Sequence, residues 1–366
     1  MIYVLHVVTD MNRGGLETMI MNYYRKIDRT KIQFHFLTHR QYIGDYGQEI
    51  ECLGGKIYHL PPLNPFSIRY RKALSDFFSN HPEYQIIHVH QDCMSSIVLK
   101  EAKKHNIPVR IAHSHSSFQD KNIKLILKLY YKRFIPKYST KLFACSEEAG
   151  RWMFNGADFE VLNNAIDSKQ YAYNHQKSVS MRKELRITDD EIVIGHVGRF
   201  YAVKNHAFLL ELLNSMQREY KTKLLLVGDG PLIDEIKEKA NENNLSDKVI
   251  FTGIRSDVSD LMQAMDVFVF PSLYEGLPLT IVEAQAAGLP CLISDVISSE
   301  CILTDLIEEK PLSDGAKQWA NRTIELSRIP RKDTSEDIKS AGFDITENAK
   351  TLVDFYLNQW EEKCQH

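Results

Sequence analysis

The apolar positions of this chain alternate between short runs, typical of buried strands, and longer stretches with the 3.6-residue period of helices. In the first half the strand-like runs are Ile2–Val8, Gln33–Leu37, Ile86–Val89, Val109–Ala112 and Lys141–Ala144. Helical stretches lie between them, at Leu16–Tyr24, Ile68–Phe78 and Ser95–His105. A strand–helix alternation of this kind predicts a parallel sheet with helices on both faces.

The same alternation restarts after a polar stretch, Ser168–Ser180. Strand-like runs follow at Ile192–Val197, Leu224–Val227, Val249–Phe251, Val267–Phe270 and Cys291–Ile293. Helical stretches follow at Phe208–Tyr220, Leu232–Asn243 and Leu279–Ala287. The sequence therefore predicts an α/β protein with two doubly wound domains, residues 1–168 and 169–346. A last helix, within residues 347–366, is expected to pack back onto the first domain.

Composition and charge narrow the class of protein. None of the six cysteines has metal-ligand spacing, which favours buried thiols in a reducing compartment. The chain opens on Ile2–Val8 without a basic segment before it, so we expect no signal peptide and a cytoplasmic protein. The first 165 residues hold 22 Lys and Arg against 15 Asp and Glu, whereas the remainder holds 23 against 33. An excess of positive charge suits an anionic lipid surface or nucleic acid.

Glycines and cations follow several predicted strands. Gly14-Gly15 precedes a helix, where bare amides suit a phosphate, although a turn without a ligand fits equally well. Gly198-Arg199 ends one strand and Lys204 opens the next helix, so two cations lie where α/β sheets bind ligands. Gly228-Asp229-Gly230-Pro231 ends the following strand, where the glycines either clear space or form a structural turn.

The most specific segment runs from Pro271 to Glu283 and contains Tyr274-Glu275-Gly276-Leu277-Pro278. Gly276 and Leu277 place free amides before a helix that begins at Pro278, and those amides together with the helix dipole can hold a phosphate. Glu283 lies between one and two turns into that helix, where a carboxylate can accept hydrogen bonds from ribose hydroxyls. The segment predicts a nucleotide site.

Together these segments resemble the retaining GT-B glycosyltransferases of family 4 (glycosyl transferases group 1) over nearly the whole chain. Ala112–His115 and Phe143–Ser146 are similar to bacterial members that build capsular polysaccharides and exopolysaccharides. The resemblance implies two Rossmann-like domains facing each other across a cleft. It also implies a UDP-hexose or UDP-N-acetylhexosamine donor and a lipid-linked saccharide acceptor in place of nucleic acid.

The resemblance also assigns residues. It implies catalytic roles for His115, Arg199, Lys204 and Glu275, with His115 beside the transferred sugar. The family usually has Asp after this His; Ser116 follows here, so His113 stays an alternative. The implied donor contacts are Gly14, Gly15, Gly198, Arg199, Lys204, Gly230, Ile254, Arg255, Glu275, Gly276, Leu277 and Glu283.

The expected chemistry needs neither a metal nor a cofactor. Two fixed cations and helix amides can stabilise a departing diphosphate, and the sequence lacks an Asp-x-Asp pair. A sugar-nucleotide epimerase or hydrolase and a non-catalytic nucleotide-sugar-binding subunit are alternatives. Classical NAD binding fits less well, because the three-glycine spacing is absent.

A basic helix in the first half predicts docking on the inner face of the cytoplasmic membrane. Lys121, Lys124, Lys128 and Lys132 share one helical face within Lys121–Tyr138. Leu125, Leu129 and Tyr131 lie among them, which suits lipid headgroups. The opposite face is expected to meet the core through Ile123, Ile126, Leu127, Tyr130 and Phe134.

Overall fold

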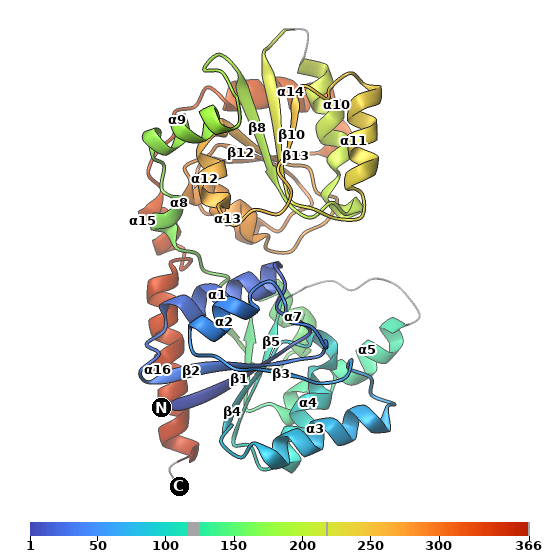
Figure 1. The fold of residues 1–366 in the computed structure, drawn as a ribbon, viewed down its shortest axis with the longest axis vertical. Helices are drawn as coiled ribbons and strands as arrows, with labels where there is room; N and C mark the ends of the chain where they lie inside the picture. The colour runs from blue at the N-terminus through green and yellow to red at the C-terminus, as the bar shows by residue number, and fades with distance from the viewer. Residues whose placement is uncertain (116–123, 217–218, 365–366) are drawn as a thin grey trace. The chain divides into compact units, whose positions relative to one another are not determined.

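The computed structural model describes residues 1–115, 124–216 and 219–364, which form two compact units (Figure 1). Unit 1 comprises Met1–Ala165 and Ile345–His366, and unit 2 comprises Ile166–Asp344. The boundary therefore falls at Ala165, against residue 168 in the sequence-based division. The last helix belongs to unit 1, so unit 2 is inserted into the chain of unit 1.

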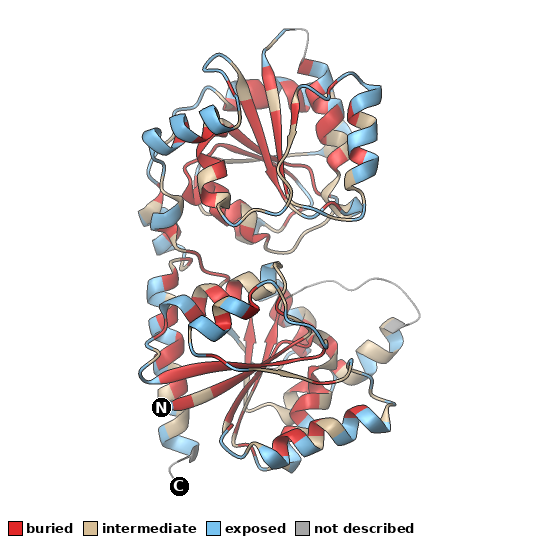
Figure 2. Ribbon diagram, in the orientation of Figure 1, coloured by how far each residue is buried: buried red, intermediate tan, exposed pale blue. Residues whose placement is uncertain are grey.

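Unit 1 is built on a parallel seven-stranded sheet with the order β3-β2-β1-β4-β5-β6-β7. The central strands are almost wholly buried, as expected for a sheet with helices on both faces (Figure 2). The strands are β1 Ile2–Val8, β2 Ile32–Thr38, β3 Ile57–His59, β4 Ile86–Val89, β5 Val109–Ser114, β6 Lys141–Ala144 and β7 Glu160–Val161.

Two helical layers cover this sheet. One core combines α1 and α16 with one face of the strands, and the other combines α3, α4 and α7 with the opposite face. Serine side chains cap two of the helices: Ser67 accepts from the Tyr70 amide and Ser146 from the Ala149 amide. The helices are α1 Gly15–Lys26, α2 Gly47–Cys52, α3 Ile68–Asn80, α4 Ser95–Lys104, α5 Lys124–Lys132, α6 Ile135–Tyr138, α7 Glu147–Phe154 and α16 Ile345–Cys364.

Unit 2 repeats the architecture with a parallel six-stranded sheet in the order β10-β9-β8-β11-β12-β13. Its strands are β8 Ile192–Val197, β9 Thr222–Val227, β10 Val249–Phe251, β11 Val267–Phe270, β12 Cys291–Ser294 and β13 Ile307–Lys310. Its helices are α8 Ser168–Tyr171, α9 His175–Glu184, α10 His206–Met216, α11 Ile233–Glu242, α12 Val258–Gln263, α13 Leu279–Ala286, α14 Gly315–Leu326 and α15 Ser335–Ser340. The prediction of two α/β domains with parallel sheets is confirmed.

The basic helix differs from its prediction. Lys132 is buried, because its ammonium donates to the Trp152 carbonyl and lies 4.0 Å from the centroid of the Trp152 ring. Ile126 and Tyr130, expected in the core, are 76% and 48% exposed. The predicted faces are therefore wrong at these three positions. Lys121 lies outside the described residues, and of Lys124 only the backbone is described.

The predicted single helix over Lys121–Tyr138 is also interrupted. Its described part forms α5 and a separate short helix, α6, with Pro136 in the first turn of α6. Proline cannot donate the hydrogen bond that would continue α5. Within the described residues, the structure contains no helix with the length and apolar character needed to cross a membrane.

Candidate active site

The predicted phosphate-binding residues gather at one edge of the unit 2 sheet. The neighbouring strands β8 and β11 are where the strand order reverses, and ligands of open α/β sheets bind outside the carboxyl ends of such strands. Gly198 and Arg199 directly follow β8, and the loop Pro271–Pro278 directly follows β11. Two hydrogen bonds join these segments: the Leu273 amide donates to the Val203 carbonyl, and the Asn205 side chain donates to the Pro271 carbonyl.

Lys204 and Glu275 form an ion pair at this edge. The Lys204 ammonium lies 2.6 Å from a Glu275 carboxylate oxygen, and the two side chains are 16% and 19% exposed. The same ammonium lies 4.5 Å from the centroid of the Phe270 ring, at the end of β11. Partial desolvation strengthens the pairing, so the pair holds a fixed, mostly buried cation against the loop that precedes α13.

The loop after β11 leads into α13, as predicted. Pro278 is the N-cap residue of α13, so the helix begins at Leu279 and the amides of Gly276 and Leu277 precede it. Ser272 Oγ and Thr280 Oγ1 are buried and have no hydrogen-bond partner among the described residues. These hydroxyls were not among the predicted site residues; Ser272 lies near the start of the loop and Thr280 in the first turn of α13.

Glycines at the strand ends allow two loops to pack closely. A Cβ on Gly228, where φ is +136°, would lie 2.2 Å from the Gly198 carbonyl oxygen, and a Cβ on Gly230 would lie 2.7 Å from the Phe200 nitrogen. Gly230 is therefore explained by packing between the loops after β8 and β9. In unit 1, Gly14 is the N-cap residue of α1, and a Cβ on Gly15 would meet nothing within 4 Å.

Glu283 lies in the second turn of α13, as predicted, but it is not open to solvent. It is 6% exposed, and the Tyr171 hydroxyl donates a 2.8 Å hydrogen bond to its Oε1. Burial raises the pKa of Glu283 to about 7, against the smaller opposing effect of the Tyr171 hydrogen bond. Tyr171 comes from α8, 112 positions earlier in the chain, and no local pattern reveals this pairing.

The raised pKa of Glu283 predicts a pH-dependent stability. Between the ordinary carboxyl pKa and about 7, the unfolded chain is ionised at this position while the folded one keeps its proton. The folded state is therefore penalised as the pH rises through this window. We expect Glu283→Gln to raise the unfolding temperature, relative to the native protein, more at about pH 8 than at about pH 5. The exposed Glu238, changed to Gln, is the control; an equal difference at both pH values would contradict the assignment.

The predicted base-binding loop follows β10. Ile254 is 60% exposed, whereas the Arg255 guanidinium pairs with Asp257 at 2.5 Å and with Glu184 at 3.2 Å. The Gly228 amide donates to the Gly253 carbonyl, which ties this loop to the one after β9. An exposed apolar side chain beside a braced arginine offers a surface on which a planar ring can stack.

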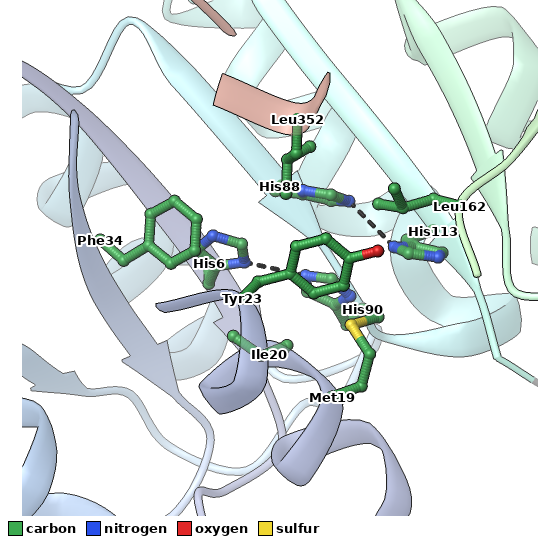
Figure 3. Close-up of a pocket in the computed structure, with 10 residues that line it drawn as sticks. All are labelled: His6, Met19, Ile20, Tyr23, Phe34, His88, His90, His113, Leu162 and Leu352. Carbon is green, nitrogen blue, oxygen red and sulfur yellow. Dashed lines mark hydrogen bonds between the residues drawn. The ribbon is translucent and has the colours of Figure 1, made fainter. Parts of the chain in front are cut away.

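In unit 1, four histidines line a small cavity beneath α1 and α16 (Figure 3), and a fifth, His115, contacts two of them. His6 pairs in register with His88, and side chains two apart on a strand point to the same face. The five are His6 on β1, His88 and His90 at the end of β4, and His113 and His115 at the end of β5. Burial lowers the pKa of all of them, that of His115 to about 3, so their rings are neutral near pH 7.

Only one of the two candidate catalytic histidines reaches the strand end with some exposure. His113 is 2% exposed, and its Nδ1 lies 3.2 Å from His88 Nε2. His115 is partly exposed and follows the last residue of β5. The greater solvent exposure of His115 therefore favours it over His113 as the candidate catalytic histidine. His88 and His90 were not predicted as site residues, although their His-x-His spacing at the end of a strand is visible in the sequence.

Taken together, the unit 2 edge can bind a phosphorylated ligand. Arg199 and Lys204 supply positive charge, the loop before α13 supplies amides, and Glu283 supplies a buried carboxyl group. Such an arrangement stabilises negative charge that develops on a leaving phosphate.

Known protein families match both units. Residues 13–170 match the family described as Glycosyltransferase Family 4, and residues 178–311 match the family described as Glycosyl transferases group 1. EpsF of Bacillus subtilis (strain 168), a protein named as a glycosyltransferase, is 39% identical over 96% of both chains.

Two further relatives and one solved structure are also similar. The capsular polysaccharide biosynthesis glycosyltransferase CapH of Staphylococcus aureus is 25% identical, over 98% of this chain and 99% of its own. The Escherichia coli UDP-Gal:alpha-D-GlcNAc-diphosphoundecaprenol alpha-1,3-galactosyltransferase is 26% identical, over 75% of this chain and 76% of its own. Anabaena HepE, solved in complex with UDP and glucose, has a TM-score of 0.78 at 17% identity, over 97% and 99% of the chains.

These matches agree with the architecture. Two Rossmann-like units with parallel sheets in one chain are the arrangement of the GT-B class, and the likeness to HepE extends over almost the whole fold. The relative at 39% identity spans nearly the full length of both chains. The chain therefore belongs to family 4 of the glycosyltransferases and has the GT-B fold.

Proposed function

We propose that this protein transfers a sugar, with retention of configuration, from a UDP-sugar to a lipid-linked saccharide during capsular polysaccharide or exopolysaccharide synthesis. The observation that carries the proposal is the Lys204–Glu275 ion pair at the switch point of unit 2, beside Arg199 and the amides that precede α13. A diphosphate bound there is neutralised by two cations, and its departure with the electrons of the glycosidic bond is stabilised.

The other donor contacts follow from the same placement. The sugar hydroxyls and the phosphate are held by Glu275, Gly276 and Leu277. Glu283 binds the ribose after the hydrogen bond from Tyr171 to Glu283 breaks. Ile254 and Arg255 receive the base. Gly14, Gly15, Gly198 and Gly230 shape the backbone near the ligand. In unit 1, His115 is assigned to the transferred sugar.

The relatives support the donor and the acceptor. HepE was solved with UDP and with UDP-glucose, which favours a UDP-hexose or UDP-N-acetylhexosamine here. The Escherichia coli relative is named for a diphosphoundecaprenol-linked acceptor, and CapH for capsular polysaccharide biosynthesis. A lipid-linked saccharide acceptor would place the enzyme at the inner face of the cytoplasmic membrane.

The proposal predicts transfer without a metal at the diphosphate, because Arg199 and Lys204 supply the charge that Mg²⁺ supplies elsewhere. Purified protein with a UDP-sugar panel and a polyprenyl-diphosphate-linked saccharide should release UDP in EDTA as fast as with added Mg²⁺ or Mn²⁺. GDP-sugars serve as the donor control. Strict dependence on a divalent ion would contradict the role of the cations. Conversion of the UDP-sugar without an acceptor would identify an epimerase or hydrolase instead.

We propose further that α5 docks on an anionic membrane, through a face that differs from the predicted one. Ile126, Leu129 and Tyr130 are exposed and, with Arg133, follow the i, i+3, i+4, i+7 spacing of one helical face. The Arg133 guanidinium lies 4.4 Å from the centroid of the Tyr130 ring and 4.7 Å from that of Phe134. Aromatic and aliphatic groups beside a cation suit the headgroup region of an anionic bilayer. Lys121, Lys124 and Lys128 stay candidates for additional contacts, whereas Lys132 does not.

Vesicle co-sedimentation tests the docking. The native protein should sediment with vesicles that contain anionic lipid, and less so as salt rises, because the attraction is partly electrostatic. Ile126→Ser and Arg133→Gln should each weaken binding several-fold. Val179→Ser, which changes an exposed apolar side chain on α9, should leave it unchanged. Binding that is equal on neutral vesicles, or insensitive to both α5 variants, would refute this surface.

A further inference from the structure

The histidines of unit 1 contain a group of three, of which the proposed transfer uses only His115. One ring nitrogen from each of His90, His113 and His115 lies within 4.8 Å of the others, at the carboxyl ends of β4 and β5. In a tetrahedral zinc site the nitrogens lie about 2.0–2.1 Å from the metal and so roughly 3.3–3.4 Å from one another. Small side-chain movements would bring the three nitrogens to such a geometry.

The hydrogen bonds leave two of the candidate nitrogens without a partner and join the third to another member of the trio. His90 Nε2 is 3.0 Å from His6 Nδ1, and His90 Nδ1 is 2.8 Å from His115 Nε2, so an ion bound at His90 Nδ1 would replace the contact between His90 and His115. His113 Nδ1 is 3.2 Å from His88 Nε2, so His113 presents its Nε2. Among the ring nitrogens of the trio, the buried His113 Nε2 and His115 Nδ1 have no hydrogen-bond partner within the described residues. A buried nitrogen without a partner costs free energy, and a metal would relieve that cost.

His6 and His88 have the position of outer-shell partners. In metal sites the second nitrogen of a ligating histidine is usually held by another polar group, which fixes the ring orientation. His6 holds His90 in this way, and His88 holds His113. The His88 ring is held in turn by the Tyr356 hydroxyl of α16, 2.6 Å from its Nδ1 (Figure 3 shows the His6–His90 and His88–His113 contacts).

We propose that His90, His113 and His115 bind a borderline divalent transition-metal ion of the Zn²⁺ type, with a fourth position left to water or an anion. Three neutral imidazoles select such ions over Mg²⁺ and Ca²⁺, which prefer oxygen ligands. The partial exposure of His115 gives the ion a way in from the sheet edge. The three proposed ligands belong to unit 1, whereas the diphosphate residues belong to unit 2.

A second trio, His6, His88 and His90, is a less suitable site. All three residues are buried, and the adjoining cavity measures only about 10 Å³, which is at most the space of one water. Both ring nitrogens of His88 are also bonded to groups outside this trio, Tyr356 and His113. An ion there would have to displace those contacts as well, and it would have no exposed ligand as an entry route.

The test measures metal binding directly, without donor or acceptor. Chelator-treated protein is titrated with Co²⁺, whose absorption reports a tetrahedral environment, and then with Zn²⁺ in competition. We expect one tight equivalent in the native protein, and its loss in His115→Gln, which is the ligand change least disruptive to the core. His6→Gln should weaken binding by roughly 10–100-fold, as loss of an outer-shell partner does. His35→Gln, at a buried histidine hydrogen-bonded to Tyr84 on the same sheet, is the control and should bind as the native protein does.

Each other outcome overturns the proposal. Absence of stoichiometric Co²⁺ binding in the native protein would do so, as would native affinity in His115→Gln. Binding that is abolished by His6→Gln and unaffected by His115→Gln would place the ion in the inner trio instead. Because these measurements need no transfer, a failed donor assay leaves the result intact, and the reverse also holds.

Discussion

Lys204→Ala should lower the turnover of sugar transfer by about 10²–10³-fold, as removal of one preorganised charge stabiliser often does. The ammonium is fixed in place by Glu275 and by the Phe270 ring, so it needs no reorganisation when the diphosphate departs. Arg199→Ala should act in the same direction. UDP release at saturating donor, with the acceptor present, measures the effect.

A matched control lies in the same unit. Lys223 pairs with Glu191 at 3.6 Å, and the two side chains are 20% and 16% exposed, which is close to the exposure of the Lys204–Glu275 pair. Lys223→Ala removes a comparable ion pair away from the switch point and should leave turnover near the native value. Near-native turnover in both Lys204→Ala and Arg199→Ala would remove the phosphate role from this edge of the sheet.

Glu275→Gln should also reduce turnover strongly, by about 10²-fold, because it loosens the cation that it holds and weakens a contact to the sugar. The losses of turnover caused by Lys204→Ala and Glu275→Gln should not multiply in the double variant. Residues that act as one unit show strongly non-additive effects, so Lys204→Ala/Glu275→Gln should be little slower than the worse single variant. The double-mutant cycle is completed by measuring all four proteins at saturating donor.

The cycle separates two interpretations of the ion pair. If the pair only stabilises the fold, the single variants should lose thermal stability while turnover per folded molecule stays high. If Glu275 and Lys204 contact the ligand independently, the two losses should multiply. Either result would contradict a single charge-stabilising unit. The corresponding cycle at Lys223 and Glu191 supplies the baseline for an ion pair without a ligand.

Sequence patterns predicted the central strands of both sheets well, because strands buried on both faces consist of continuous apolar residues. Strands at the edges of the sheets were harder to predict. β13 is Ile-Glu-Glu-Lys, and its polar composition gave no strand signal, although it pairs in register with β12. The prediction of which face of α5 points toward the core failed for a different reason. An amphipathic helix with apolar residues on both sides has no unique inward face until a partner such as Trp152 selects one.

The residues of the candidate site also divide into those that the sequence predicts and those that it does not. Residues that directly follow strands, such as Arg199, could be placed from the pattern alone, because the carboxyl edge of a parallel sheet is fixed by topology. The Tyr171–Glu283 hydrogen bond and the His6–His90–His115 chain join residues that are distant in sequence. They depend on which helix covers α13 and on strand register, and neither is contained in a local motif.

The chain path through the two units has a consequence for synthesis on the ribosome. Residues 166–344 form unit 2 without interruption, so that unit can close as soon as its own segment has emerged. Unit 1 begins first but lacks α16, whose Tyr356 and Leu352 contact the histidine face, until residues 345–364 have been synthesised. During translation, only α1 can cover the face of β1, β4 and β5 that bears His6, His88 and His113 while unit 2 is being made. The core of unit 1 can therefore be completed only after the whole of unit 2 has been synthesised.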